Sequence, residues 1–137
     1  MTETLTPETA QAFLEANFAP WIRALELRIA QIDAERTVLE MPITDEINRT
    51  GGIVSGQALA ALADTAMVFG CCGHLGEMHP VGTVTLDTQF LRPASGAALR
   101  AEAEVTRAGR SMIFARCAIR EEPSGKTVAP ATATFAR

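Results

Sequence analysis

The chain has 137 residues, of which 47% are hydrophobic and 20% charged, so it can bury a substantial core and is not an intrinsically disordered chain. The formal net charge of −4 and the lack of a basic stripe argue against nucleic-acid binding. Its three cysteines, two of them adjacent, match neither a disulfide framework nor a zinc motif, so we expect reduced thiols.

Residues 1–19 are expected to form an N-terminal helical segment. Thr6 is suited to the N-cap, Pro7 to the first helical position and Glu8 to the first turn. The segment lacks the basic start and apolar run of a signal peptide, so we expect a cytoplasmic protein.

Residues 25–43 read as a β-hairpin. Leu25, Leu27 and Ile29 alternate with charged residues, which predicts a half-buried strand. The polar run 33–36 predicts the turn, and Leu39 and Met41 lie in the second strand. A polar loop is expected over 44–52.

Residues 51–73 contain a single charged side chain, Asp64, among small and apolar residues. Their length would allow a membrane span, but the five glycines and the polar residues argue against one. We therefore expect a helix buried inside a globular protein and no membrane partner.

The last third of the chain returns to a period of two. Strands are expected over 82–91, 98–107, 111–121 and 127–136, separated by turns rich in Gly, Pro and Ser. Such short connections predict an antiparallel four-strand meander. Pro130 cannot donate to a ladder and implies an edge strand or a bulge. The order predicts one α+β domain over 1–137, a curled antiparallel sheet wrapped around a long central helix.

Asp64 is the strongest candidate for chemistry. Its helical neighbours are Ala60, Ala61, Met67 and Val68, so nothing on its own helix neutralises its charge. Burial of an unpaired carboxylate is costly, so the group either bonds to a distant strand or the Gly-rich loop, or serves as a reactive carboxylate in a cleft.

Ser55 and Gly56 stand where this helix begins. Ser55 is suited to the N-cap, and the backbone N–H of Gly56 lies at the positive end of the helix dipole, where it can polarise a carbonyl oxygen. The simpler interpretation is that both residues merely start the helix.

The chain resembles the hotdog-fold acyl-CoA thioesterases of the PaaI and 4-hydroxybenzoyl-CoA type. The resemblance covers roughly residues 20–136 and rests on six stretches in the family's order: 48–56, 62–66, 83–86, 90–94, 108–111 and 128–129. It implies a homodimer or homotetramer that hydrolyses acyl-CoA without a metal or redox cofactor.

By position, the resemblance makes Asp64 the nucleophile or the general base, and the Gly56 N–H the group that polarises the thioester carbonyl. Asn48 and Thr83 correspond to residues that place substrate or water. The residues at substrate- or CoA-contacting positions are Ser55, Gln57, Arg92, Arg107, Gly109, Arg110 and Ser111. Two features depart from the family: Ser55-Gly56-Gln57 replaces the usual His-Gly-Gly, and the loop from Asn48 to Gly56 is one residue longer than in some members.

Helix geometry predicts a shared site. Eight positions separate Gly56 from Asp64, a distance of about 12 Å along a helix. Both groups must lie about 3 Å from one reacting group. Two chains about a twofold axis can satisfy both, with Asp64 of one facing Gly56 of the other.

Two other functions remain open at this stage. A hotdog hydratase or dehydratase would need a suitably placed His, and neither His74 nor His79 matches such a position. A non-catalytic acyl-CoA-binding module would not require Asp64. The acyl group itself is not specified, since Ala60 and Ala61 leave room for an aromatic ring or a medium-length chain.

Overall fold

The computed structural model describes residues 4–137, so the expected N-terminal segment is seen from its fourth residue onward. Helix α1 spans Pro7–Asn17, and its start is the expected one: the Thr6 hydroxyl accepts the N–H of Thr9 at 3.1 Å. Residues 1–3, on which part of the signal-peptide argument rests, lie outside the described part. A short helix α2 follows at Pro20–Arg23.

The first strand begins later than predicted. Strand β1 spans Arg28–Ile32, whereas Leu25 and Leu27 precede it. Pro20 starts α2, and the chain then leaves α2 through Glu26, which has a left-handed φ of 58°. Such a residue breaks the extended backbone, although Leu27 is still buried at 3% exposure.

The predicted hairpin turn is confirmed. Strand β1 pairs antiparallel with β2, Thr37–Pro42. Asp33 holds the turn, because its Oδ1 accepts the N–H groups of Glu35 and Arg36, both at 2.9 Å, and these bonds hold the pKa of Asp33 below its ordinary value. The expected polar loop contains the 3-10 helix η1, Asp45–Ile47, and a small ladder of β3, Asn48–Arg49, with β4, Ile53–Val54.

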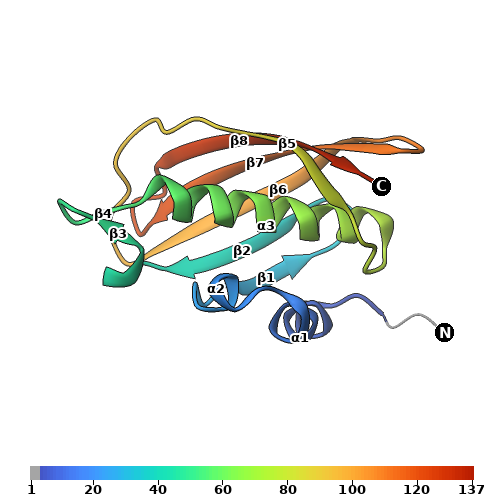
Figure 1. The fold of residues 1–137 in the computed structure, drawn as a ribbon, viewed down its shortest axis with the longest axis horizontal. Coiled ribbons are helices and arrows are strands. Elements are labelled where there is room, and N and C mark those ends of the chain that lie inside the picture. Colours follow the sequence, from blue (N-terminus) through green and yellow to red (C-terminus); the bar gives the residue numbers. More distant parts are fainter. Residues whose placement is uncertain (1–3) are drawn as a thin grey trace.

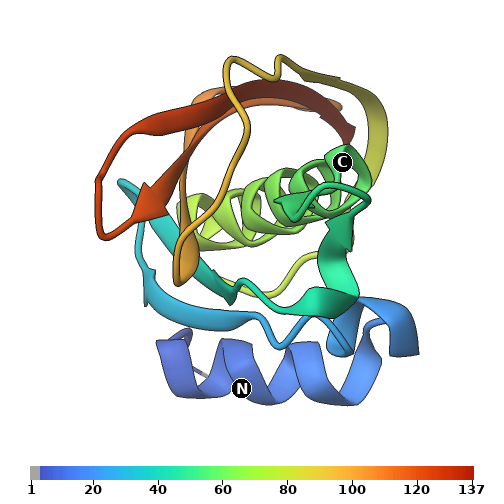
Figure 2. The ribbon, with the colours of Figure 1, turned by 90° about the vertical axis from the view of Figure 1, so that its left-hand side faces the viewer.

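Helix α3, Gly56–Leu75, is the expected central helix. It lies across the concave side of the sheet, which curls around it (Figures 1 and 2). By length and composition it could cross a membrane, but 72% of its most apolar window is buried inside the protein, as in the core helix of a soluble fold. Gly73 permits close packing here, since a Cβ at that position would lie 2.7 Å from the carbonyl oxygen of Asp33.

The large sheet has the order β1-β2-β6-β7-β8-β5, with all neighbours antiparallel. Its later strands are β5 Gly82–Thr88, β6 Ala98–Ala108, β7 Met112–Glu122 and β8 Thr127–Ala136. The α+β architecture predicted from the sequence is confirmed, but the four-strand meander is wrong. Only β6, β7 and β8 form a meander, because residues 89–97 cross the start of α3 and deliver β6 beside β2 (Figure 1). Strand β5 therefore pairs with β8 at one edge.

Pro130 lies inside the sheet rather than on an edge strand. It pairs with Ala118 of β7, and its carbonyl accepts the N–H of Gln89 at 3.0 Å. Its nitrogen points to the same side, just beyond the last β5–β8 pair, Thr88 with Ala131, so the contact with Gln89 lacks only the return bond from position 130 to the Gln89 carbonyl. The alternative expectation, a bulge, is met nearby, where the β7–β8 register shifts between Ile119 and Arg120.

Helix α1 covers the opposite edge of the sheet, beneath β1 (Figure 2). Ala10 and Leu14 are its buried residues. Its Gln11 side chain binds the free backbone of β1, accepting from the Ile29 N–H at 2.8 Å and donating to the Leu27 carbonyl at 2.9 Å. The β1 edge is therefore occupied, whereas no strand within residues 4–137 pairs with the outer edge of β5.

Candidate active site

Asp64 and Thr83 are brought together across the seam between α3 and β5. The Thr83 hydroxyl donates a hydrogen bond of 2.9 Å to Asp64 Oδ1. Asp64 is partly exposed in the middle of α3, where the residues beside it on the helix are small or apolar. The predicted carboxylate thus faces outward with one hydroxyl partner.

Burial raises the pKa of Asp64 above its ordinary value, and the Thr83 hydrogen bond partly offsets that rise. Among residues 4–137, no cationic side chain forms an ion pair with this carboxylate. A carboxylate with a raised pKa and no counter-charge is a better base than an exposed one.

The first turn of α3 presents unpaired N–H groups. Ser55 is the N-cap, and its side chain accepts the Ala58 N–H at 3.2 Å. The Leu59 N–H bonds to the Ser55 carbonyl, but within the described chain the N–H groups of Gly56 and Gln57 have no acceptor. The predicted N-cap is confirmed, and two donors at the positive end of the helix are free to bind an oxygen with partial negative charge.

Asn48 lies close to this turn through the backbone. It pairs with Val54 in the β3–β4 ladder, and the Ser55 N–H bonds to the carbonyl of Ile47 at 2.8 Å. The Asn48 Oδ1 atom is buried and has no hydrogen-bond partner within residues 4–137. Buried polar atoms are nearly always satisfied, so this oxygen needs a water or ligand donor.

One stripe of α3 is not buried and consists of Gln57, Ala60, Asp64 and Val68, which recur at helical spacing, and Gly56 lies next to its first residue. The rest of the helix, apart from its ends, is buried. Within one chain the stripe separates the carboxylate from the free N–H groups by about 12 Å. The structure therefore keeps two groups of predicted site residues apart, which we call the candidate half-sites: Asp64 with Thr83, and Gly56 with Ser55, Gln57 and Asn48.

The predicted arginine group is divided between opposite ends of the sheet (Figure 1). Arg92 is exposed in the 89–97 segment, where its charge helps to lower the pKa of Glu121, chiefly lowered by the Ser95 N–H. Arg107 and Arg110 lie at the other end, in or beside the β6–β7 turn. That turn also holds Gly109 and Ser111, whose carbonyls accept bonds from Arg137. One chain does not bring Arg92 and Arg110 together.

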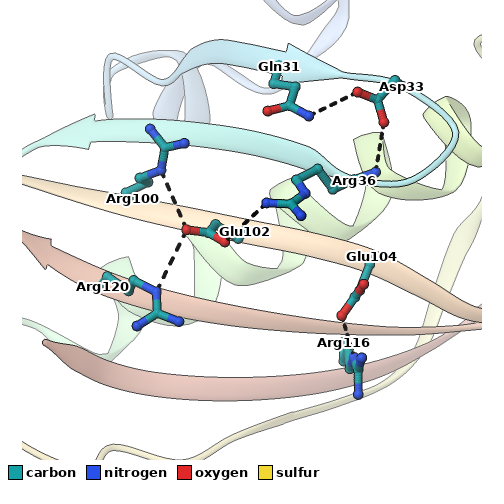
Figure 3. A network of polar contacts seen from close by, with 8 residues as sticks. All are labelled: Gln31, Asp33, Arg36, Arg100, Glu102, Glu104, Arg116 and Arg120. Carbon is teal, nitrogen blue, oxygen red and sulfur yellow. Dashed lines mark hydrogen bonds and ion pairs between the residues drawn. The ribbon is translucent and has the colours of Figure 1, made fainter. Parts of the chain in front are cut away.

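A different set of arginines gathers on the outer face of the sheet, away from α3 (Figure 3). Glu102 lies 4.0, 3.6 and 3.7 Å from Arg36, Arg100 and Arg120, and Glu104 pairs with Arg116 at 2.7 Å. A cavity of about 550 Å³ lies here, but its lining contains three arginines together with three acids, Asp87, Glu102 and Glu104. The positive and negative side chains that line this cavity are equal in number, and none of its lining residues is a predicted site residue.

Two residues near the half-sites had no predicted role. Thr88 has a buried hydroxyl oxygen without a partner among the described residues. Phe90 places its ring against Gly56, with Cζ 3.3 Å from where a Cβ on that glycine would lie. The sequence signal for Phe90 was the 90–94 stretch, in which only Arg92 was given a role.

The remaining titratable groups form no second centre in the described chain. No three His, Cys, Asp or Glu side chains of residues 4–137 are grouped to hold a metal ion. Cys71, Cys72 and Cys117 are free and buried, and burial raises the pKa of Cys71 and Cys117 to about 12. His74 lies in the last turn of α3 rather than in a loop, 3.4 Å from the Ala34 carbonyl.

Comparison with known proteins gives a consistent result. The model of the thioesterase superfamily matches residues 51–128. A thioesterase from Haemophilus influenzae shares the fold, with 21% identity, a TM-score of 0.87, and coverage of 98% of this chain and 92% of that one. The Escherichia coli PaaI protein of the phenylacetic acid degradation operon has 25% identity, a TM-score of 0.83, and coverage of 95% and 91%.

A phenylacetic acid degradation-related protein from Ralstonia eutropha has 27% identity, a TM-score of 0.80, and coverage of 93% of this chain and 98% of that one. No curated protein matches the chain by sequence. The PaaI-like hotdog fold expected from the sequence resemblance is confirmed.

Proposed function

The chain belongs to the thioesterase superfamily and is a thioester hydrolase, and we propose that it cleaves aromatic or medium-chain acyl-CoA in a site shared by two subunits. The observation that carries the proposal is the pairing of a partly buried carboxylate, Asp64, with Thr83, on the uncovered helix stripe that begins at Gln57, beside the free N–H groups of Gly56 and Gln57.

Asp64 supplies the reactive carboxylate by one of two routes, as a general base or as a nucleophile. As a general base it takes a proton from water while the water oxygen bonds to the thioester carbon, and the C–S bond then breaks to release CoA thiol and the free acid. As a nucleophile it bonds to that carbon itself while the C–S bond breaks and CoA leaves as the thiolate, and water later cleaves the mixed anhydride to release the free acid, protonate the thiolate and restore the carboxylate. Thr83 orients the carboxylate in both.

The Gly56 N–H polarises the thioester carbonyl. Its donor has no acceptor in the described chain, and it lies at the helix end where negative charge is stabilised. Asn48 supports this half-site, because its unpartnered Oδ1 can accept a hydrogen bond from water or substrate. Ser55 fixes the turn, and Gln57 borders the acyl group.

A second subunit is needed because one chain keeps the half-sites about 12 Å apart. The free edge of β5 is the surface we propose for it: Val84 and Leu86 are 52% and 37% exposed, and Gln11 blocks the only other edge of the large sheet. Antiparallel pairing of two β5 strands would run the two α3 helices in opposite directions, so Asp64 of each faces Gly56 of the other.

The same twofold axis accounts for the divided arginines. The axis would make the strands of the two subunits run in opposite directions. The end of the sheet that holds Arg92 in one subunit would then lie beside the end that holds Arg107 and Arg110 in the other. We propose that CoA phosphates bind there, with Gly109 and Ser111 shaping the turn. Association of two such dimers into a tetramer is a further part of the proposal.

The experiment is thiol release from a panel of acyl-CoA esters by the wild type and by Asp64→Asn. The wild type should hydrolyse aromatic or medium-chain esters, and the variant should bind them with a loss of turnover of roughly 10²–10⁴-fold. Equal turnover by a folded variant contradicts the role of Asp64. Tight binding without hydrolysis by the wild type would instead favour an acyl-CoA-binding module.

A further inference from the structure

The chain beyond β5 follows α3 in the reverse direction, toward the start of the helix. Although β5 ends at Thr88, the N–H groups of Gln89 and Leu91 still bond to the carbonyls of Pro130 and Val128, at 3.0 and 2.9 Å. Alternate side chains of an extended segment point to opposite faces. Gln89 lines the cavity on the outer face, so Phe90 points toward α3.

The Phe90 ring lies against the first turn of α3. Three of its ring carbons are 3.3, 3.6 and 3.7 Å from the position that a Cβ on Gly56 would take. The φ of Gly56 is not in the left-handed region, so the backbone does not demand a glycine here. Contact with Phe90 favours the glycine instead, because a Cβ at this position would require the ring to shift by a few tenths of an ångström.

The backbone that carries the ring is held on both sides, although the Phe90 side chain is 55% exposed. The bonds of Gln89 and Leu91 to β8 hold the backbone on both sides, and the Val54 N–H bonds to the Ala94 carbonyl at 3.1 Å, tying the same segment to the residue before Ser55. An exposed aromatic ring held beside two free N–H groups is positioned to contact whatever those groups bind.

We propose that Phe90, in the subunit that supplies Gly56, contacts the substrate and disfavours acyl groups that are branched at the carbon next to the carbonyl. This inference rests on the proposed function, since it assumes a thioester oxygen on the Gly56 N–H. The two groups attached to the carbonyl carbon then lie within contact distance of the ring. The sulfur is common to all acyl-CoA, so the ring discriminates only at the first acyl carbon.

The test compares hexanoyl-CoA with 2-methylhexanoyl-CoA, which differ by one methyl group at that carbon. One methyl group in an apolar site is worth roughly 10–200-fold in kcat/KM. We expect Phe90→Ala to lower the wild-type preference for the unbranched ester by about tenfold, and Phe90→Leu to lower it less. Comparison of ratios between variants cancels the intrinsic difference in reactivity of the two esters.

Phe114→Ala is the matched control, because Phe114 is 41% exposed but lies on the outer face of β7. Its ratio should equal that of the wild type. The inference is overturned if Phe90→Ala remains dimeric and has the wild-type ratio of kcat/KM for the two esters. It is also overturned if both Phe90 variants become monomers, because the ring would then serve subunit association rather than substrate selection. If the wild type hydrolyses neither these two esters nor any other acyl-CoA, both the proposed function and the inference about Phe90 are wrong. If it hydrolyses them and the ratios are the same in all variants, only the inference about Phe90 is wrong.

Discussion

The side chain of Gln11 occupies the backbone edge of Ile29, accepting its N–H at 2.8 Å, while the other end of the same amide donates to Leu27. A glutamine on α1 thereby takes the place that a neighbouring strand would have on β1. Open edges invite pairing with another chain. The protein closes one edge of its sheet in this way, and the other edge, at β5, is the one at which we propose that a second subunit binds.

Gln11→Ala should therefore open the β1 edge. We expect a loss of about 1–3 kcal/mol of unfolding free energy, because a backbone donor and acceptor lose their partner, and species larger than the wild-type oligomer in light scattering. Asn17→Ala is the control, since Asn17 bonds only to the Phe13 carbonyl of its own helix. Wild-type stability and size in Gln11→Ala would contradict this account of the edge.

The hydrogen bond from the Thr83 hydroxyl should determine the pH below which the enzyme loses activity. Burial raises the pKa of Asp64 and the Thr83 bond lowers it, so Thr83→Val leaves burial unopposed and the pKa rises. Since hydrolysis needs the ionised carboxylate, the acidic limb of kcat/KM should move to higher pH. Thr83→Ser keeps the hydroxyl and should keep the wild-type profile. A shift in the opposite direction would exclude Asp64 as the titrating group.

Ionised Asp64 should also lower the free energy of unfolding at neutral pH. A carboxyl whose pKa is raised on folding binds more protons in the native state, so stability falls as pH rises from its ordinary value of 3.8 through the folded value. Asp64→Asn should then raise the Tm at pH 7, by at most about 4 °C, and the gain should vanish below pH 3.8. Thermal unfolding at both pH values measures this, and a lower Tm for the variant at pH 7 would contradict it.

Local chemistry in the sequence was sufficient to single out much of the candidate site, whose catalytic roles remain predictions. Asp64 stood out because a lone charge in an apolar helix is costly, and Ser55 because helix starts select hydroxyl side chains. Thr83 required the family resemblance, since no periodicity links it to a residue nineteen positions earlier. The helix and most strand positions followed from the change in hydrophobic period.

Other features depended on information that is not local. The 89–97 connection is short enough for β5 to pair with β6, and nothing in its composition reveals that it crosses α3 instead. Glu26 adopts a left-handed φ although its type does not require it. The contact of Phe90 with Gly56 follows from that crossing, so it could not be predicted before the topology was known.

CoA recognition should depend on arginines from both ends of the sheet. We expect Arg92→Ala and Arg110→Ala each to raise KM about tenfold, the value of one charge-assisted hydrogen bond, with a smaller effect on kcat. Added salt should weaken CoA binding by the wild type. Arg28→Ala is the control, because Arg28 pairs with Glu40 on β1 and β2. Normal binding by both test variants at low salt would place the CoA site elsewhere.

Mixed dimers provide the sharpest test of a shared site. Asp64→Asn removes the carboxylate, and Gly56→Pro removes the N–H that polarises the carbonyl, so each homodimer should be nearly inactive. In a heterodimer one site carries both substitutions, while the other pairs an intact Asp64 with an intact Gly56. Mixed subunits should therefore recover up to half of the wild-type activity per dimer.

The backbone is suited to this proline. Position 56 is the first of α3, where proline is favoured, and Ser55 already has the extended conformation, φ −67° and ψ 148°, that a following proline requires. The cost is contact with the Phe90 ring, which Gly56→Ala reproduces while keeping the N–H. The alanine variant should thus retain more activity than the proline variant, and the difference between them measures the N–H. Well-folded heterodimers that stay inactive would show that Asp64 and Gly56 do not meet across the interface.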